Sequence, residues 1–90
     1  MKKQVTWRGC EAQPEVEGRI DALLAGLPGG GAGITLAKFA LELREPSEHA
    51  VALVIALADG GEPLVRHGEG RDWNAAFLEL ERKLARAFES

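Results

Sequence analysis

The chain is poor in the residue types that form disulfides, metal sites and nucleophile–base pairs. It has one cysteine, Cys10, and two histidines, His49 and His67, among 90 residues. A single cysteine excludes an intramolecular disulfide and supplies only one thiolate to a metal. Neither histidine stands at a metal-ligand spacing from the cysteine or a carboxylate, and no third residue is placed to orient a nucleophile and base. We therefore expect no catalytic residue, no metal, no cofactor and no enzyme activity.

Long apolar runs and aromatic side chains are also scarce. No run approaches the ~18 apolar residues that a membrane-spanning helix requires, so we expect a cytosolic (cytoplasmic) location. Aromatic residues make up 6% of the chain and hydrophobic residues of all kinds 46%, so the core is expected to be aliphatic. A chain of 90 residues has room for one compact domain, which we place at residues 1–90.

Glycine is concentrated at residues 29–33, in a stretch that superficially resembles a phosphate-binding loop. A Walker-type loop continues into a Lys followed by Ser or Thr at the start of a helix. Here the glycines lead into residues 34–36, which are predicted to form a strand. We interpret this stretch as a flexible connection without nucleotide binding.

The apolar residues that are present recur with two different periods. Alternation with a period of two predicts strands at residues 4–8, 34–44, 49–58 and 64–68. Helical spacing predicts an amphipathic helix over residues 14–27 and a second helix from residue 73 onward. The order is therefore β-α-β-β-β-α. This order predicts a two-layer α+β domain, a four-stranded sheet with both helices packed on one face.

The segment from Glu69 to Phe77 is the most informative part of the chain, because a strand end, a glycine and a helix cap follow one another there. Gly70 is expected to adopt a positive φ. The Asp72 side chain is expected to accept hydrogen bonds from the first free N–H groups of the last helix. The apolar stripe that this helix is expected to bury comprises Trp73, Phe77, Leu80, Leu84 and Phe88.

The element order and the local residues together resemble one known family, the ribosome hibernation-promoting factors, also called ribosome-associated inhibitors or sigma-factor modulation proteins. The most specific similarity is a Glu-Gly-x-Asp-aromatic-x-Ala corner, matched by residues 69–76. Weaker matches are the acidic Glu11 before the first helix, a Gly-Gly hairpin at residues 60–61 and a Lys-Leu pair at residues 83–84. The resemblance spans almost the whole chain.

This resemblance implies binding to the small ribosomal subunit and its ribosomal RNA, in the channel of messenger and transfer RNA, with translation silenced during the stress response. Such binding needs cations that neutralise RNA phosphates. Because the chain ends at Ser90, the resemblance is to a short form without an additional C-terminal dimerisation domain. If the first strand and the last helix are neighbours, the basic residues form one edge. The candidate RNA-binding residues are Lys2, Lys3, Arg8, Arg71, Arg82, Lys83 and Arg86.

A second hypothesis is a protein-interaction module that keeps this fold without a basic surface. The chain has 14 Asp and Glu against 11 Lys and Arg, a formal net charge of −3. Three of the acids, Glu15, Glu17 and Asp21, stand on the first helix. The outward positions of the sheet are unusually apolar, and two copies that stack their sheets there form a homodimer. The residues of this candidate interface are Ala40, Ala52, Val54 and Ala56.

Overall fold

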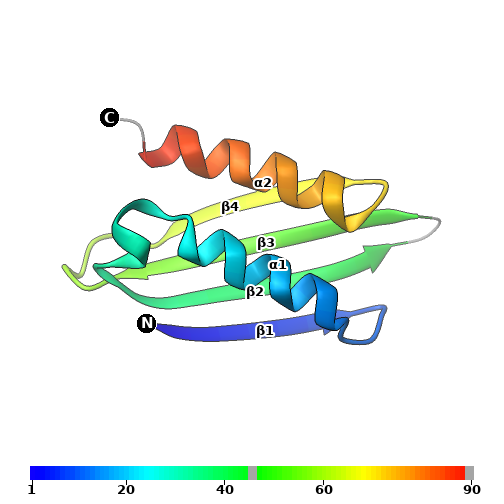
Figure 1. Ribbon diagram of the computed structural model, residues 1–90, viewed down its shortest axis with the longest axis horizontal. Coiled ribbons are helices and arrows are strands. Elements are labelled where there is room, and N and C mark those ends of the chain that lie inside the picture. The colour runs from blue at the N-terminus through cyan, green and yellow to red at the C-terminus, as the bar shows by residue number, and fades with distance from the viewer. Residues whose placement is uncertain (45–46, 89–90) are drawn as a thin grey trace.

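Four strands form one sheet, and two helices cover one of its faces (Figure 1). The computed structural model describes residues 1–44 and 47–88. The strands are β1 (Lys2–Arg8), β2 (Ile34–Arg44), β3 (Glu48–Leu57) and β4 (Leu64–Gly70). The helices are α1 (Pro14–Ala25), the short 3-10 turn η1 (Pro28–Gly31) and α2 (Trp73–Phe88). The predicted element order and the two-layer α+β class are confirmed.

The strands lie in the order β1-β2-β3-β4, so neighbours in the sheet are also neighbours in the sequence. The pair β1–β2 is parallel, and the pairs β2–β3 and β3–β4 are antiparallel. A parallel pair requires a crossover connection, which α1 and η1 supply. The predicted tight link between β2 and β3 includes residues 45 and 46, which lie outside the described residues. As a consequence of this order, β1 and β4 form opposite edges of the sheet.

The predicted alternation of buried and outward positions holds along the two central strands. Leu43 and Leu57, which share the inward face by this alternation, are only partly buried because they stand near strand ends. The fully or almost fully buried residues of β2 and β3 are Ala37, Phe39, Leu41, Val51, Leu53 and Ile55. The helices add the fully buried Ile20, Phe77 and Leu80. The core is therefore mainly aliphatic, and it lies between the sheet and the helices.

Several element boundaries differ from the prediction by a few residues. β1 begins at Lys2, two residues earlier, and β4 continues to Gly70. α1 ends at Ala25, and the N–H of Gly26 still donates to the carbonyl of Ala22 at 3.1 Å. Leu27 remains buried although it lies beyond the helix. Neither α1 nor α2 is long and apolar enough to cross a membrane.

The backbones of α2 and β4 approach each other closely at two glycines. A Cβ atom on Gly68 would lie 2.8 Å from the amide nitrogen of Leu80 and closer still to the carbonyl oxygen of Ala76. A Cβ atom on Gly70 would lie 2.9 Å from the amide nitrogen of Ala76. The positive φ expected for Gly70 is wrong, because positive φ is confined to other glycines of the described chain. Gly70 is required by the nearness of the helix and not by its backbone angle.

We expect Gly68→Ala to lower the free energy of unfolding by about 1 to 3 kcal/mol, because the added methyl group overlaps the α2 backbone. Urea unfolding followed by circular dichroism measures this change. The matched control is Gly18→Ala in α1, where a Cβ atom meets nothing within 4 Å. This control should gain roughly 0.5 to 1 kcal/mol from helix propensity. Equal stabilities for the two variants would contradict close α2–β4 packing at Gly68.

Candidate nucleic-acid interface

The structure separates the candidate RNA-binding residues into two groups. Lys2, Lys3 and Arg8 belong to β1 at one edge of the sheet. The others precede or belong to α2, which packs over β4 and, to a lesser degree, β3. The first strand and the last helix meet at Trp7 and Trp73 but do not lie side by side, so the condition for a single basic edge is not met. The reason is the α1 crossover, which places β1 beside β2 and far from β4.

Within the β1 group, the side chains alternate between the two faces of the sheet. Lys3 points to the helix side, where its Nζ lies 2.7 Å from Oδ1 of Asp21 on α1. Lys2 and Arg8 are exposed and belong to the positions that face away from the helices. Lys3 is thus already paired with a carboxylate, whereas Lys2 and Arg8 have no ion pair within the described ranges 1–44 and 47–88.

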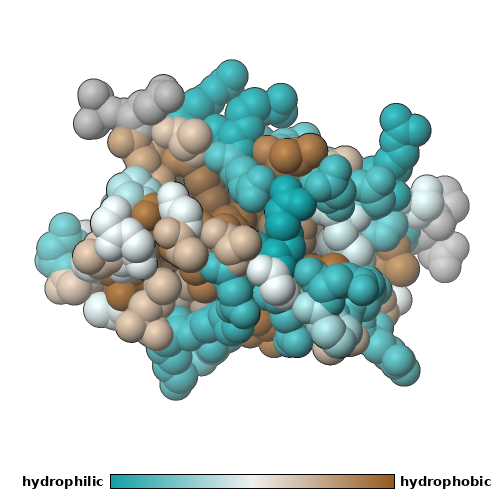
Figure 2. All heavy atoms as spheres, in the orientation of Figure 1, coloured by the Kyte–Doolittle hydropathy of each residue, from teal (hydrophilic) through white to brown (hydrophobic). Residues whose placement is uncertain are grey.

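On α2, Arg82 and Arg86 are exposed and stand one helical turn apart. Neither forms an ion pair with any residue that the structure describes. Figure 2 shows hydrophilic side chains along the upper edge of the molecule, over the helix labelled α2 in Figure 1. These two guanidinium groups are the cations of α2 most available to an anionic partner.

Lys83 is held more firmly than its two basic neighbours on α2. Its Nζ donates to the carbonyl oxygen of His67 at 2.9 Å and lies 3.1 Å from Oε1 of Glu79, one helical turn earlier. The hydrogen bond from Lys83 lowers the pKa of the Glu79 carboxyl. The lysine therefore ties α2 to the exposed edge of β4 and offers less free charge than Arg82 or Arg86.

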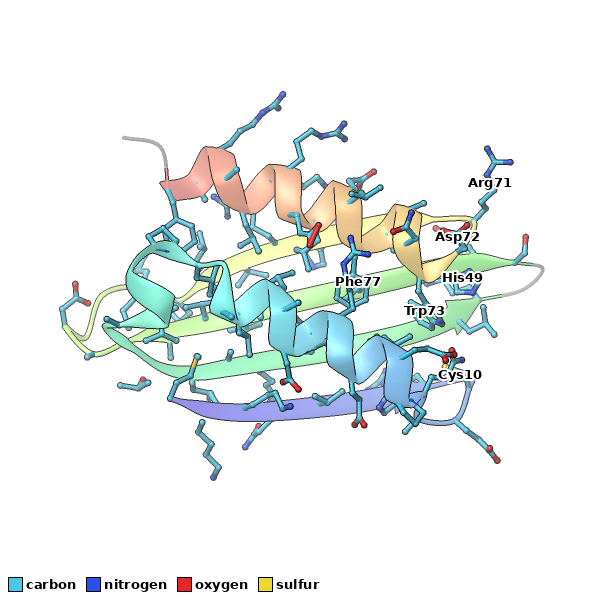
Figure 3. The ribbon with its side chains drawn as sticks, in the orientation of Figure 1. Cys10, His49, Arg71, Asp72, Trp73 and Phe77 are labelled. Carbon is cyan, nitrogen blue, oxygen red and sulfur yellow. The ribbon has the colours of Figure 1, made fainter. Side chains whose placement is uncertain are left out.

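The corner between β4 and α2 is built as the sequence predicts. Oδ1 of Asp72 accepts a hydrogen bond from the N–H of Ala75 at 2.7 Å, which satisfies one of the free donors of the helix start. Arg71 is exposed and extends away from the sheet at this corner (Figure 3). Trp73 turns the other way and packs against the edge of the core. Arg71 is thus the one cation of this corner directed into solvent.

Trp73 lies among aromatic rings at the end of the sheet (Figure 3). Its ring centroid is 4.7 Å from that of His49 and 6.0 Å from that of Trp7, both in edge-to-face geometry. Such pairs are favourable because the positive ring edge meets the negative ring face. The prediction that Trp73 is first a packing residue is confirmed.

Arg19 has a structural role that the sequence analysis missed. From α1 its guanidinium donates to Oδ1 of Asn74 at 2.9 Å and to Oε1 of Glu81 at 3.0 Å, both on α2. The same group lies 5.7 Å from the centre of the Phe77 ring. A sequence signal exists, since Arg19 stands three residues after the buried Val16 and so flanks the apolar stripe of α1. Arg19 joins the two helices, and its charge is offset by Glu81.

A second group missed by the sequence analysis surrounds Arg44 at the end of β2. Its guanidinium forms a hydrogen bond to Glu42, and its Nη1 lies 3.5 Å from Glu48 and 3.9 Å from Glu69. The hydrogen bond to Glu42 raises the pKa of Arg44, while a hydrogen bond shared with the Glu69 carboxyl raises the pKa of Glu48. One cation is thus shared by three carboxylates that meet from three strands.

The residues of the alternative interface lie together on the face turned away from the helices. Ala40 is exposed, and Ala52, Val54 and Ala56 are partly exposed. Ala40 and Ala52 are direct cross-strand neighbours in the register of β2 and β3. Figure 1 shows both helices on the opposite face, so no described helix covers this patch.

A groove lies between the C-terminal halves of the two helices. Its volume is about 440 Å³, and it is lined mainly by apolar residues of α1 and α2. Phe88, predicted to be buried, borders this groove and is 37% exposed because the groove separates it from α1. Among residues 1–44 and 47–88, no cluster of three or more His, Cys, Asp or Glu side chains is arranged to hold a metal ion.

A scan against protein-family models finds no match, and a search of curated proteins finds no sequence relative. Solved structures do match. A ribosomal subunit interface protein from Coxiella burnetii superposes with a TM-score of 0.79 at 16% identity, covering 100% of both chains. The N-terminal domain of Protein Y from Thermus thermophilus superposes with a TM-score of 0.73 at 20% identity, covering 96% of this chain and 94% of that one. This chain shares their fold. The likeness of fold expected from the sequence is confirmed over nearly its whole length.

We expect the carboxyl groups of Glu79 and Glu48 to titrate on opposite sides of the ordinary glutamate range. Because the folded pKa of Glu79 is lowered, its contribution to stability is present above its unfolded pKa and is lost as the pH falls through its folded pKa. Glu48 has a raised pKa, so its effect has the opposite sign, and stability is gained as the pH falls through that pKa. An NMR titration of the side-chain carboxyl carbons measures both values.

The variant Lys83→Ala provides the control for this titration. It should raise the pKa of Glu79 towards the ordinary range and leave that of Glu48 unchanged, since Glu48 responds to Glu69 and not to Lys83. An unchanged pKa of Glu79 in this variant would show that the Lys83–Glu79 contact does not persist in solution.

Proposed function

We propose that this protein is a ribosome-binding factor of the hibernation type, which binds the small ribosomal subunit through its RNA and silences translation without catalysis. The observation that carries this proposal is the full-length fold likeness to a protein described as a ribosomal subunit interface protein and to the Protein Y N-terminal domain. The family corner at residues 69–76 supports it, because its glycine, its capping aspartate and its aromatic residue each have a defined role in this structure. A cytoplasmic location, where ribosomes are found, follows from the same proposal.

The distribution of charge favours one face for RNA contact. The exposed face of α1 carries Glu15, Glu17 and Asp21, which repel phosphates. The exposed face of α2 carries Arg82 and Arg86, which lack ion pairs among the described residues, and Arg71 extends from the corner before it. A protein with net charge −3 still approaches RNA productively when its cations are gathered on one side. We place the RNA contact on α2 and Arg71, with Lys83 as a partly neutralised neighbour.

The β1 residues of the candidate set contribute less in this proposal. Lys3 is paired with Asp21 on the helix side of the sheet, and Lys2 and Arg8 are on the far side from α2. One rigid RNA surface contacts both groups only if it wraps around the molecule. We therefore treat β1 as a secondary contact of the small subunit.

We expect the purified protein to co-sediment with small ribosomal subunits, with a bound fraction that falls as salt rises. Each phosphate contact on single-stranded RNA contributes roughly −0.7 to the slope of log K against log salt. Contacts by Arg71, Arg82 and Arg86 thus predict a slope of about −2. Absence of binding at low salt would contradict the proposal, and salt-independent binding would contradict the assignment to RNA phosphates.

The α2 face is tested by removing two charges from it and two from elsewhere. We expect the double variant Arg82→Ala, Arg86→Ala to reduce the magnitude of the salt slope by about 1 to 2, with weaker binding at every salt concentration. The matched control is Lys2→Ala with Lys38→Ala, which removes the same charge from the outer face of the sheet. A smaller effect of the control assigns binding to α2. Equal effects would mean that only net charge matters and would overturn the assignment of the face.

A further inference from the structure

The outer face of the sheet, meaning the face turned away from α1 and α2, has a basic half and an acidic half. Its side chains alternate with the buried ones along each strand. The outward cations are all on β1 and β2, together with one acid, Glu42. The outward acids Glu48 and Glu69 are on β3 and β4, whose outward positions hold no Lys or Arg. The outward cations of the basic half are Lys2, Arg8, Lys38 and Arg44.

The centre of the outer face holds the short apolar side chains of Ala40, Ala52 and Ala56, with Lys38 beside them on β2. The β2–β3 register pairs Ala40 with Ala52 and Leu36 with Ala56 across the centre line of the sheet. A shallow concavity of about 320 Å³ lies on this face and extends from Thr6 on β1 to His67 on β4. Methyl side chains at the centre allow a second sheet to approach to the usual separation of about 10 Å.

We propose that this face is a homodimer interface, formed with a second copy of the chain related by a two-fold axis that runs parallel to the strands between β2 and β3. Such an axis lays β1 of one copy over β4 of the other, and β2 over β3. It therefore places the basic half of each copy against the acidic half of its partner. The proposal goes beyond ribosome binding and does not depend on it.

The register of the sheet specifies which residues meet across this axis. Arg8, Glu42, Ala50 and Glu69 form one row across the four strands, because each is the Cα partner of the next. The two-fold axis reverses this row in the second copy, so Arg8 of each copy lies opposite Glu69 of the other. In the same way Arg44 faces Glu48 of the second copy. Each of these charge pairs occurs twice in the dimer.

The central row of the outer face brings no like charges together. It runs Thr6, Ala40, Ala52 and His67 across the four strands. Ala40 of each copy thus meets Ala52 of the other, and Thr6 meets His67 of the other. The small residues at the centre and the charge pairs nearer the strand ends resemble the apolar core and polar rim of known interfaces.

A different two-fold axis on the same face fits less well. If the axis ran across the strands along the central row, each strand would lie over its own copy. Glu42 would then face Lys38 of the second copy, but the other four charges would lose their opposite-charge partners. Arg44 would face Leu36, Glu48 would face Ala56, Arg8 would face Gln4 and Glu69 would face Val65 of the second copy. An RNA partner is also disfavoured on this face, because Glu42, Glu48 and Glu69 at its end repel phosphates. A second copy with reversed halves pairs Arg8 with Glu69 and Arg44 with Glu48, and leaves Lys38 opposite Val54 and Glu42 opposite Ala50 of the second copy.

The area of the outer face sets the expected affinity of the dimer. Over the seven residues of the edge strands β1 and β4, four strands about 4.8 Å apart cover roughly 450 Å² in projection. A standard stable interface buries about 800 Å² on each partner. We therefore expect a weak dimer, with a dissociation constant in the micromolar to submillimolar range, and the measurement must extend to about 1 mM protein.

The test is sedimentation velocity of the purified chain over a concentration series at low salt, without ribosomes. The chain should shift from monomer to dimer as its concentration rises. Arg8→Glu alone and Glu69→Arg alone each place like charges opposite each other at two positions, so each should weaken self-association by about tenfold or more. An equimolar mixture of the two variants restores both opposite-charge pairs in a heterodimer. The mixture should therefore recover association close to that of the unchanged chain.

Two control variants test whether the position of the changed charge matters, and not only the change in net charge. Glu17→Arg and Arg82→Glu make the same changes of charge on the helix-covered side and should leave dimerisation unchanged. Circular dichroism checks that all four variants keep the fold. A chain that is monomeric at about 1 mM overturns the proposal. Single variants that still dimerise, or a mixture that stays monomeric, equally overturn it, whether or not ribosome binding is found.

Discussion

The contact between the α2 backbone and the β4 backbone at Gly68 is the constraint on which the rest of the structure depends. A helix can lie this close to a strand only where the strand has no side chain. The close approach positions Phe77 and Leu80 inside the core and carries Trp73 to its place beside His49. It also directs the opposite side of α2, with Arg82 and Arg86, into solvent. The packing of α2 against β4 thus determines which charged side chains of α2 are exposed to solvent.

The sequence predicted the fold well, because the fold is set by local periodicity. The buried alternation of β2 and β3 and the Asp72 cap were recoverable, since both depend on residues close together in the chain. The role of Gly70 was misjudged. Its neighbour Ala76 is six positions away and approaches it only once the helix has folded back, so glycine is needed there for space. The burial predicted for Phe88 was also wrong, because helical periodicity does not reveal that a groove separates the C-terminal halves of α1 and α2.

The candidate site was harder to predict, since a surface depends on which elements become neighbours. The candidate basic residues of β1 and α2 have the same charge, but they do not lie at the same edge of the sheet. The reason is that α1 crosses over and places β1 beside β2. Ion pairing further reduces the number of candidate cations that are free to bind an anion. Lys3 is neutralised by Asp21, and Lys83 is shared by Glu79 and His67. All three partners lie on other elements or other turns, so counting basic residues overestimates the positive charge available to an RNA partner. Arg19 went unnoticed for the same reason, as its partners are on α2.

The two faces of the molecule differ in the kind of partner that they suit. On α2 the exposed cations lack described carboxylate partners, and free cations are what a polyanion requires. On the outer face of the sheet the cations are on β1 and β2, whereas Glu48 and Glu69 are on β3 and β4 and Glu42 is on β2. A uniform polyanion would be attracted by the cations and repelled by these acids. A copy of the same surface, turned by a two-fold axis, gains from both. The excess of acids over bases in the whole chain is compatible with the proposed RNA contact, because Glu48 and Glu69 lie on the outer face of the sheet and not on α2 beside Arg82 and Arg86.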